Sequence, residues 1–166
     1  MTADAETGRT VSPWDVALRL LGVRARSRHE VRERLLRRGF EDDVVDDVMT
    51  RLDRAGLLDD SDFAAEWVRS RHAHSGRGRI ALKQELRTKG IDAEVIDEAL
   101  ADIDPGAERA NAAQMAAKKL ATMRVDLTDR AERDKAYRRL AGMLSRRGYD
   151  QSTVIEVVGE VLGSRS

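Results

Sequence analysis

Three blocks of clustered arginines and lysines are the parts of this 166-residue sequence with the clearest chemical meaning. Residues 24–38 hold seven arginines against two glutamates, residues 69–89 seven bases against one glutamate, and residues 130–147 seven bases against two acids. Clustered guanidinium and ammonium groups bind polyanions, because each phosphate they neutralise releases counterions. The blocks therefore indicate a surface for nucleic acid or for an acidic partner.

A second explanation of the same bases is local. Bases in the last turn of a helix, and acids in the first turn of the next, complement the helix dipoles. That explains bases such as Arg37 and Arg38, but not bases away from helix ends. From charge and position we take eleven residues as candidates for binding: Arg32, Arg34, Arg69, Arg71, Arg77, Arg79, Lys83, Arg87, Lys89, Arg138 and Arg139.

The second block includes a predicted loop from Arg69 to Arg79, in which Gly76 and Gly78 alternate with Arg77 and Arg79. Two glycines allow close approach to the backbone, so the segment could grip a phosphate or a partner carboxylate. The alternative is a flexible loop between helices in which the arginines have no role. It matches neither of the glycine-rich patterns of nucleotide-binding loops.

Catalysis and metal binding find little support. The chain has no cysteine, and His72 and His74 would point to different faces of a helix, with His29 remote. The acidic runs lack a partnered His, Ser or Lys of the kind that nucleophilic catalysis needs. We expect no enzyme, no catalytic residues, no cofactor and no metal. Phe63 and Trp67 lie four apart, which favours a packing stripe over a base-stacking platform.

The elements that carry the bases form a repeat. Three segments read basic helix, glycine, hydrophobe and acidic helix, at Val31–Leu52, Leu82–Ile103 and Leu140–Val161. The glycine fits a left-handed C′ residue, and an acid two positions on fits an N-cap: Glu41 or Asp42, Asp92 and Asp150. Flanking apolar residues have the spacing of a hydrophobic staple in each copy.

Each repeat is preceded by one more helical segment, at 14–23, 62–72 and 106–123. We therefore predict an all-α chain of about nine helices, arranged as three tandem three-helix repeats that pack end to end. The expected modules are 12–58, 59–104 and 105–163, with tails at 1–11 and 164–166. A helix-turn-helix mode of binding is disfavoured, because the helix that would enter the groove is acidic.

The run LLGVRARSRHEVRERLLRRGF, followed by LDRAGLLDDSDFAAEWVRSRHAHSGRGRIALKQELRTKGI and by KAYRRLAGMLSRRGY, resembles the RecX regulatory proteins. The resemblance covers nearly all of residues 14–162 and is most specific over 62–91. It implies that the three modules form an elongated, curved array. It further implies a regulator that binds RecA recombinase filaments on single-stranded DNA. It also implies that ATP hydrolysis, strand exchange and coprotease activity are restrained, in DNA repair and the SOS response.

We expect RecA and single-stranded DNA as partners, with duplex DNA left open, no membrane partner, and a cytoplasmic monomer. The sequence shows neither a secretion signal nor an apolar run long enough for a membrane span. Two other functions stay open. One is an autonomous DNA-binding protein, and the other is a helical adaptor whose charges serve only the helix dipoles.

Overall fold

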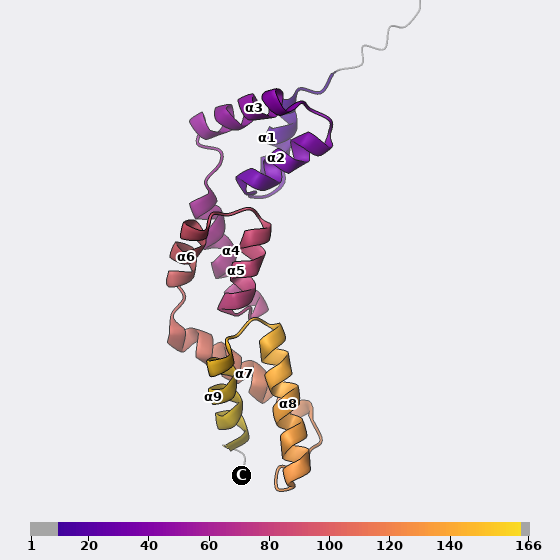
Figure 1. The fold of residues 1–166 in the computed structure, drawn as a ribbon, viewed down its shortest axis with the longest axis vertical. Coiled ribbons are helices and arrows are strands. Elements are labelled where there is room, and N and C mark those ends of the chain that lie inside the picture. The colour runs from indigo at the N-terminus through magenta and orange to yellow at the C-terminus, as the bar shows by residue number, and fades with distance from the viewer. Residues whose placement is uncertain (1–9, 164–166) are drawn as a thin grey trace, which may run out of the picture. The chain divides into compact units, whose positions relative to one another are not determined.

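The structure, a computed structural model, describes residues 10–163, and over these residues it consists of α-helices without a strand (Figure 1). This confirms the predicted all-α class. Most of the expected tails lie outside the described residues. The helices are α1 (Pro13–Val23), α2 (Arg28–Arg37), α3 (Asp42–Arg54), α4 (Asp60–Ser75), α5 (Arg79–Thr88), α6 (Ala93–Ala101), α7 (Pro105–Thr122), α8 (Arg130–Arg146) and α9 (Gln151–Gly163).

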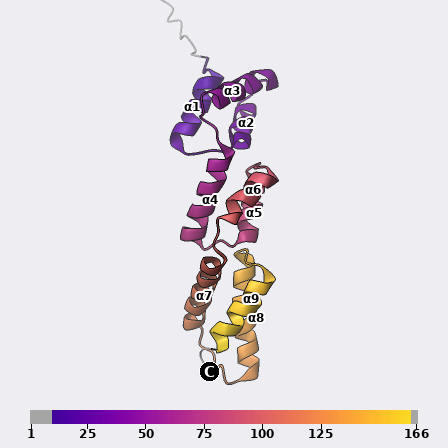
Figure 2. The same ribbon diagram turned by 90° about the vertical axis from the view of Figure 1, so that its left-hand side faces the viewer.

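The described part of the chain forms two compact units, which divide between Phe63 and Ala64 in α4. In the first unit, α1, α2 and α3 pack on one another around a core that includes Val31, Leu35 and Leu52. In the second, α5 packs on α6, and α7, α8 and α9 enclose a further core (Figure 2). The second and third expected repeats thus fall mostly in one unit, while their exact boundaries remain predictions.

The repeated glycine turn forms as predicted. Gly39, Gly90 and Gly148 have φ of +89°, +72° and +92°, a left-handed conformation that costs glycine little. In the first copy the Gly39 amide donates to the Leu36 carbonyl and the Phe40 amide to the Leu35 carbonyl, and the other two copies repeat this pattern. These paired bonds close the end of each basic helix and turn the chain into the acidic one.

The predicted side-chain caps form only in the third repeat. The Asp150 carboxylate accepts a hydrogen bond from the Thr153 amide at 2.7 Å. Glu41 and Asp92 occupy the N-cap positions but make no side-chain cap bond. Their charge still lies next to the positive end of the helix dipole, so position matters there more than a specific bond.

The helix that opens the second repeat, α4, is longer than predicted. It was expected at residues 62–72, with an open segment from Arg69 to Arg79, but α4 runs from Asp60 to Ser75. The Asp59 carboxylate accepts from the Asp62 amide at 3.1 Å, which starts the helix early, and no residue breaks it before Gly76. The loop is therefore only Gly76–Gly78, and Arg69 and Arg71 are helical. Among the residues described, no helix is both long and apolar enough to cross a membrane.

Candidate nucleic-acid interface

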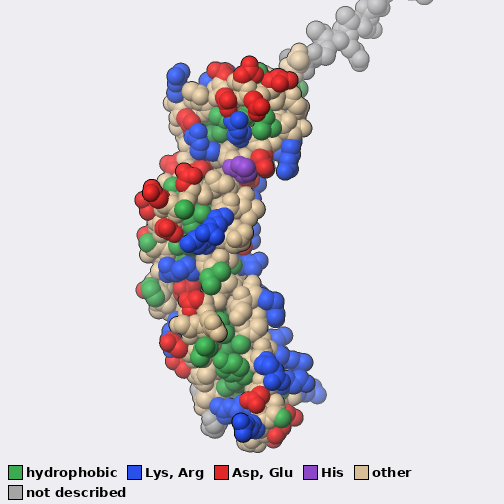
Figure 3. Space-filling model, viewed as in Figure 1, with side chains coloured by type: hydrophobic (Ala, Val, Ile, Leu, Met, Phe, Trp, Pro, Cys, Tyr) green, Lys and Arg blue, Asp and Glu red, His purple; other side chains and the backbone are tan. Residues whose placement is uncertain are grey.

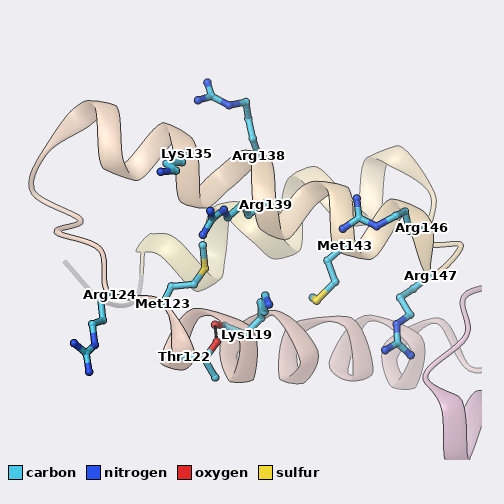
Figure 4. A pocket seen from close by; sticks show the side chains of 10 residues that line it. All are labelled: Lys119, Thr122, Met123, Arg124, Lys135, Arg138, Arg139, Met143, Arg146 and Arg147. Carbon is cyan, nitrogen blue, oxygen red and sulfur yellow. Dashed lines mark hydrogen bonds between the residues drawn. The ribbon is translucent and has the colours of Figure 1, made fainter.

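A groove with a volume of about 930 Å³ runs between α7 and α8, and bases dominate its lining. Figure 4 shows Lys119 and Arg139 in the space between the two helices, while Arg138 and Arg124 point outward from it. In the space-filling view, Lys and Arg side chains gather over α8 (Figure 3). The lining residues are Lys119, Thr122, Met123, Arg124, Lys135, Arg138, Arg139, Met143, Arg146 and Arg147.

The helical period places these bases on the open side of α8. Ala136, Leu140 and Leu144 are fully buried, at intervals of four residues, and fix the inner face of the helix. Arg138 and Arg139 between them, and Lys135 just before them, are exposed. Exposed bases thus follow directly from the buried stripe that holds α8 in place.

On α7 the buried positions carry small side chains as well as Leu120. Ala112 and Ala116 are fully buried and pack in the same core as Leu140 and Leu144. The two half-buried methionines of the lining, Met123 and Met143, belong to the margin of that core. The groove therefore combines apolar side chains next to the core with charged groups exposed to solvent.

The seven bases of the groove lack acidic partners within residues 10–163. Among the described residues, none of them forms an ion pair, and only the Arg147 guanidinium has a hydrogen-bond partner, the Ser75 carbonyl at 2.8 Å. Arg109, also on α7, contrasts with them because it pairs with Glu156 and Glu160. The hydrogen bond that Arg109 donates to Glu156 and the charge of Glu160 raise the pKa of Arg109.

The contrast between the unpaired groove bases and the paired Arg109 distinguishes the two explanations of the basic blocks, which are ligand binding and complementation of the helix dipoles. A base near a helix end complements the dipole wherever it lies, but seven like charges around one groove also repel one another. A polyanion that enters the groove would relieve the repulsion and release counterions. The groove therefore fits a phosphate-bearing ligand better than a purely local role for its charges.

The groove offers no aromatic side chain among its lining residues. Proteins that hold bases of single strands usually stack them on aromatic rings. Recognition here would accordingly rest on phosphate contacts, which position a strand without reading its sequence.

Most of the predicted bases of the second repeat are already engaged. Arg77 lies 3.4 Å from Glu85, Lys83 lies 3.8 Å from Asp97 and Arg69 lies 2.6 Å from Glu66. These pairs are exposed or half-buried, so each contributes only about 0–1 kcal/mol and a ligand phosphate can replace the acid. They remain candidates, although they do not line the groove.

The indole of Trp67 contacts charged side chains of the same unit. The Arg71 guanidinium lies 4.5 Å and the Lys89 ammonium 5.2 Å from the ring centroid, and the indole Nε1 donates to Glu85 at 2.9 Å. Phe63 is buried, with 7% of its surface exposed. Both aromatics therefore pack, as predicted, and the Trp67 indole already has two cations and a carboxylate as partners.

The Gly76–Gly78 loop contacts another part of the chain. The Gly78 amide donates to the Arg147 carbonyl at 2.8 Å, and the Ile80 amide donates to the Gly148 carbonyl at 3.0 Å. The Tyr149 hydroxyl donates to the Gly76 carbonyl at 2.9 Å. Neither explanation drawn from sequence, a phosphate grip or a flexible loop, anticipated this joint with the third repeat.

Arg79 takes part in the same joint. Its amide donates to the Glu108 carboxylate at 3.0 Å, and its Nε lies 3.6 Å from the other carboxylate oxygen. Glu108 is 7% exposed. Arg79 thus neutralises a buried acid, which gives this candidate a structural role that is independent of any ligand.

The remaining candidates divide between the two units. In the first unit, the hydrogen bond and charge of Asp46 raise the pKa of Arg32, which also lies 3.7 Å from Asp42. Arg34 and Arg87 are exposed. Of the eleven predicted bases, only Arg138 and Arg139 line the groove.

Sequence reasoning missed five of the groove's bases: Lys119, Arg124, Lys135, Arg146 and Arg147. A usable signal was present, because the short connection between α7 and α8 makes the two helices antiparallel neighbours. Bases near the end of α7 must then face bases on α8. Among the described residues, no cluster of His, Cys, Asp or Glu is suited to hold a metal ion.

Comparison with known proteins gives the family. Residues 14–52 match the profile described as the first three-helix domain of RecX, and residues 59–100 match that of the second. The regulatory protein RecX of Mycolicibacterium smegmatis is 53% identical over 151 residues, which are 90% of this chain and 79% of that protein. RecX of Mycobacterium avium is 47% identical over 154 residues, 93% of this chain and 87% of that protein.

Solved structures agree on the fold. The crystal structure of RecX from Lactobacillus salivarius matches with a TM-score of 0.76 and 20% identity, over 90% of this chain and 94% of that one. A second crystal structure of a regulatory protein RecX matches with a TM-score of 0.73 and 22% identity, over 89% of this chain and 70% of that one. The relatives are named as regulatory proteins rather than enzymes. The chain therefore belongs to the RecX family of regulatory proteins.

Proposed function

We propose that this chain binds RecA filaments on single-stranded DNA and restrains their ATP hydrolysis, strand exchange and coprotease activity. The regulation would serve DNA repair and the SOS response, with the protein acting as a cytoplasmic monomer. The observation that carries the proposal is the groove between α7 and α8, with seven bases and no acidic partner among the described residues.

The chemistry of the groove suits a regulator of filaments. A recombinase filament assembles on single strands of any sequence, so a regulator must hold the strand without reading its bases. A groove that supplies phosphate contacts does this, because the phosphates are the same whatever the sequence. The electrostatic attraction would also speed association and make it sensitive to salt.

Direct action on DNA is the second candidate function. The same groove could bind free single-stranded or duplex DNA without any contact to a recombinase. The two functions differ in the amount of protein that they need. A regulator that acts on filaments works below the concentration that would cover free strands, whereas a competitor for DNA does not.

The distinguishing experiment is a titration into the cognate recombinase on single-stranded DNA, following ATP hydrolysis. The control repeats the titration with a large excess of free strand. Inhibition at substoichiometric protein that survives the excess strand supports regulation of the filament. Inhibition that disappears with excess strand would leave autonomous DNA binding as the function.

A further inference from the structure

A second hollow in residues 64–166 differs from the groove in both shape and charge. It has a volume of about 360 Å³ and lies where α4, α6 and the start of α7 meet. It shares no lining residue with the basic groove. Its lining residues are Ala65, Val68, Arg69, His72, Ala99, Asp102, Ile103, Asp104 and Ala107.

The wall of the hollow is apolar because small side chains face one another there. Ala65 comes from α4, Ala99 from α6 and Ala107 from α7, with the buried Val68 and Ile103 beside them. Larger apolar side chains at these three positions would fill the space and stabilise the fold by about 0.8 kcal/mol for each buried methylene. The alanines instead leave an apolar surface open, since Ala107 is exposed and Ala65 is half-buried.

His72 lines the hollow, but both nitrogens of its imidazole ring already have partners within the protein. Its Nδ1 lies 3.1 Å from the Arg77 carbonyl and its Nε2 lies 3.3 Å from the Asn111 amide nitrogen. Both contacts lie within hydrogen-bond distance. Both ring nitrogens are thus engaged within the protein.

The rim of the hollow is charged, and its free charge is negative. The exposed Asp102 carboxylate makes no hydrogen bond or ion pair among the described residues. Asp104 accepts from the Ala107 amide at 2.9 Å, and the Arg69 guanidinium is paired with Glu66. A phosphate would be repelled by the two aspartates, whereas a lysine or arginine would be attracted.

From the apolar wall and the free carboxylate we infer that this hollow receives a large apolar side chain of a protein partner, next to a basic residue that pairs with Asp102. Interfaces concentrate their binding energy in such pockets, where an apolar anchor is buried inside a polar rim. The inference rests on the proposed function, in which the partner is the protein component of the filament. It assigns protein binding to the hollow and nucleic-acid binding to the groove.

The test fills the hollow without touching the groove. Ala107→Leu occupies the space, Ala107→Ser changes the same position without filling it, and Ala117→Leu adds the same side chain at an exposed site on α7 that lines neither cavity. Each variant is measured for affinity to the recombinase filament and, separately, to free single-stranded DNA. Circular dichroism and the melting temperature check that each variant folds.

We expect Ala107→Leu to weaken filament binding about tenfold, the effect of about 1.4 kcal/mol, and to leave binding of free DNA unchanged. Asp102→Asn should weaken filament binding by a smaller factor, while Ala107→Ser and Ala117→Leu should bind like the unmodified protein. Normal filament binding by folded Ala107→Leu would overturn the inference and leave the proposed function standing. Equal losses for filament and free DNA would also overturn it, because the hollow would then belong to the nucleic-acid surface.

If the unmodified protein binds the filament no better than free DNA, the proposed function itself fails and the inference falls with it. That outcome is seen before any variant is measured. The two failures are therefore distinguishable.

Discussion

Gly78 and Gly148 lie against each other through bare backbone: a Cβ on Gly78 would stand 2.5 Å from the Gly148 carbonyl oxygen. A Cβ on Gly148 would in turn stand 2.3 Å from the Cβ of Ala81. Neither position has room for any side chain. The contact joins the loop before α5 to the turn before α9, whose residue Arg147 also lines the basic groove.

Replacement of Gly148 by alanine should destabilise the chain strongly. The residue has a φ of +92°, which strains any residue with a Cβ, and the added atom would meet Ala81. We expect Gly148→Ala to lower the free energy of unfolding by about 2–4 kcal/mol, the sum of backbone strain and overpacking. Urea denaturation followed by circular dichroism measures this.

Gly159→Ala is the matched control for that substitution. Gly159 lies inside α9, and apart from its own stretch of helix no atom lies within 4 Å of the position of a Cβ. The same change should there raise the free energy of unfolding by about 0.5–1 kcal/mol, because alanine favours the helix. Equal effects at the two glycines would refute the close approach of the backbones.

The buried acid of the joint gives a second prediction. Glu108→Ala removes the acceptor for the Arg79 amide and the partner of its guanidinium. The loss should be about 1–3 kcal/mol in the free energy of unfolding, since a half-buried donor is left unsatisfied. Glu108→Gln keeps an acceptor oxygen and should cost less. Similar stabilities of both variants and the unmodified chain would mean that Glu108 does not hold the loop.

The ion pair between Arg79 and Glu108 also affects the interpretation of binding measurements on charge-reversal variants of the second repeat. Reversal of Arg77, Arg79 and Lys83 should weaken filament binding if these candidates contact the ligand. The same change breaks their pairs with Glu85, Glu108 and Asp97, so unfolding must be measured on the same samples. A loss of binding counts for the candidates only where the stability of the variant is close to that of the unmodified chain.

Tyr149 gives a prediction on pH. Burial, and to a smaller extent the charge of Glu108, raise the pKa of its hydroxyl from its ordinary value of 10 to about 12. The folded state thus favours the protonated form, and this contribution to stability is complete below pH 10 and is lost as the pH rises from 10 to 12. The hydroxyl remains a donor to Gly76 at neutral pH.

Tyr149→Phe isolates that contribution. At pH 7 the variant should unfold with about 1 kcal/mol less free energy, because the hydrogen bond to the Gly76 carbonyl is lost. Between pH 10 and 12 the unmodified chain should lose stability faster than the variant, so the two curves converge. Parallel curves over that range would contradict the burial of the hydroxyl.

The fold was largely predictable because its signals are local. The three glycines and the apolar residues in register around them specify the turns, and left-handed φ at Gly39, Gly90 and Gly148 confirms this. The end of α4 was not predictable from the same kind of pattern, because polar residues such as Arg71 and His72 suit a helix and a loop equally well. Only the glycine at position 76 sets the limit.

The candidate site was less predictable because it depends on tertiary packing. Arg138 and Arg139 stand out as a basic pair in sequence, but Lys119 joins them only through the packing of α7 on α8. Likewise, the glycine at position 78 signals a close approach without saying what approaches. In this chain the approaching group is the backbone at Gly148, not a ligand.

The central claim, that the groove between α7 and α8 binds the phosphate backbone, is tested most directly by the salt dependence of DNA binding. A triple variant, Lys119→Gln, Lys135→Gln and Arg139→Gln, removes three unpaired bases. Arg109→Gln is the control, since it removes a charge that Glu156 and Glu160 already neutralise. Affinity for a single-stranded oligonucleotide is measured by fluorescence anisotropy across a series of salt concentrations.

We expect the triple variant to bind more weakly and to reduce the slope of log affinity against log salt by about 2, because each lost phosphate contact on a single strand removes about 0.7. Arg109→Gln should leave the slope unchanged. A folded triple variant that keeps both the affinity and the slope of the unmodified protein would contradict the claim and place the nucleic-acid surface elsewhere on the chain.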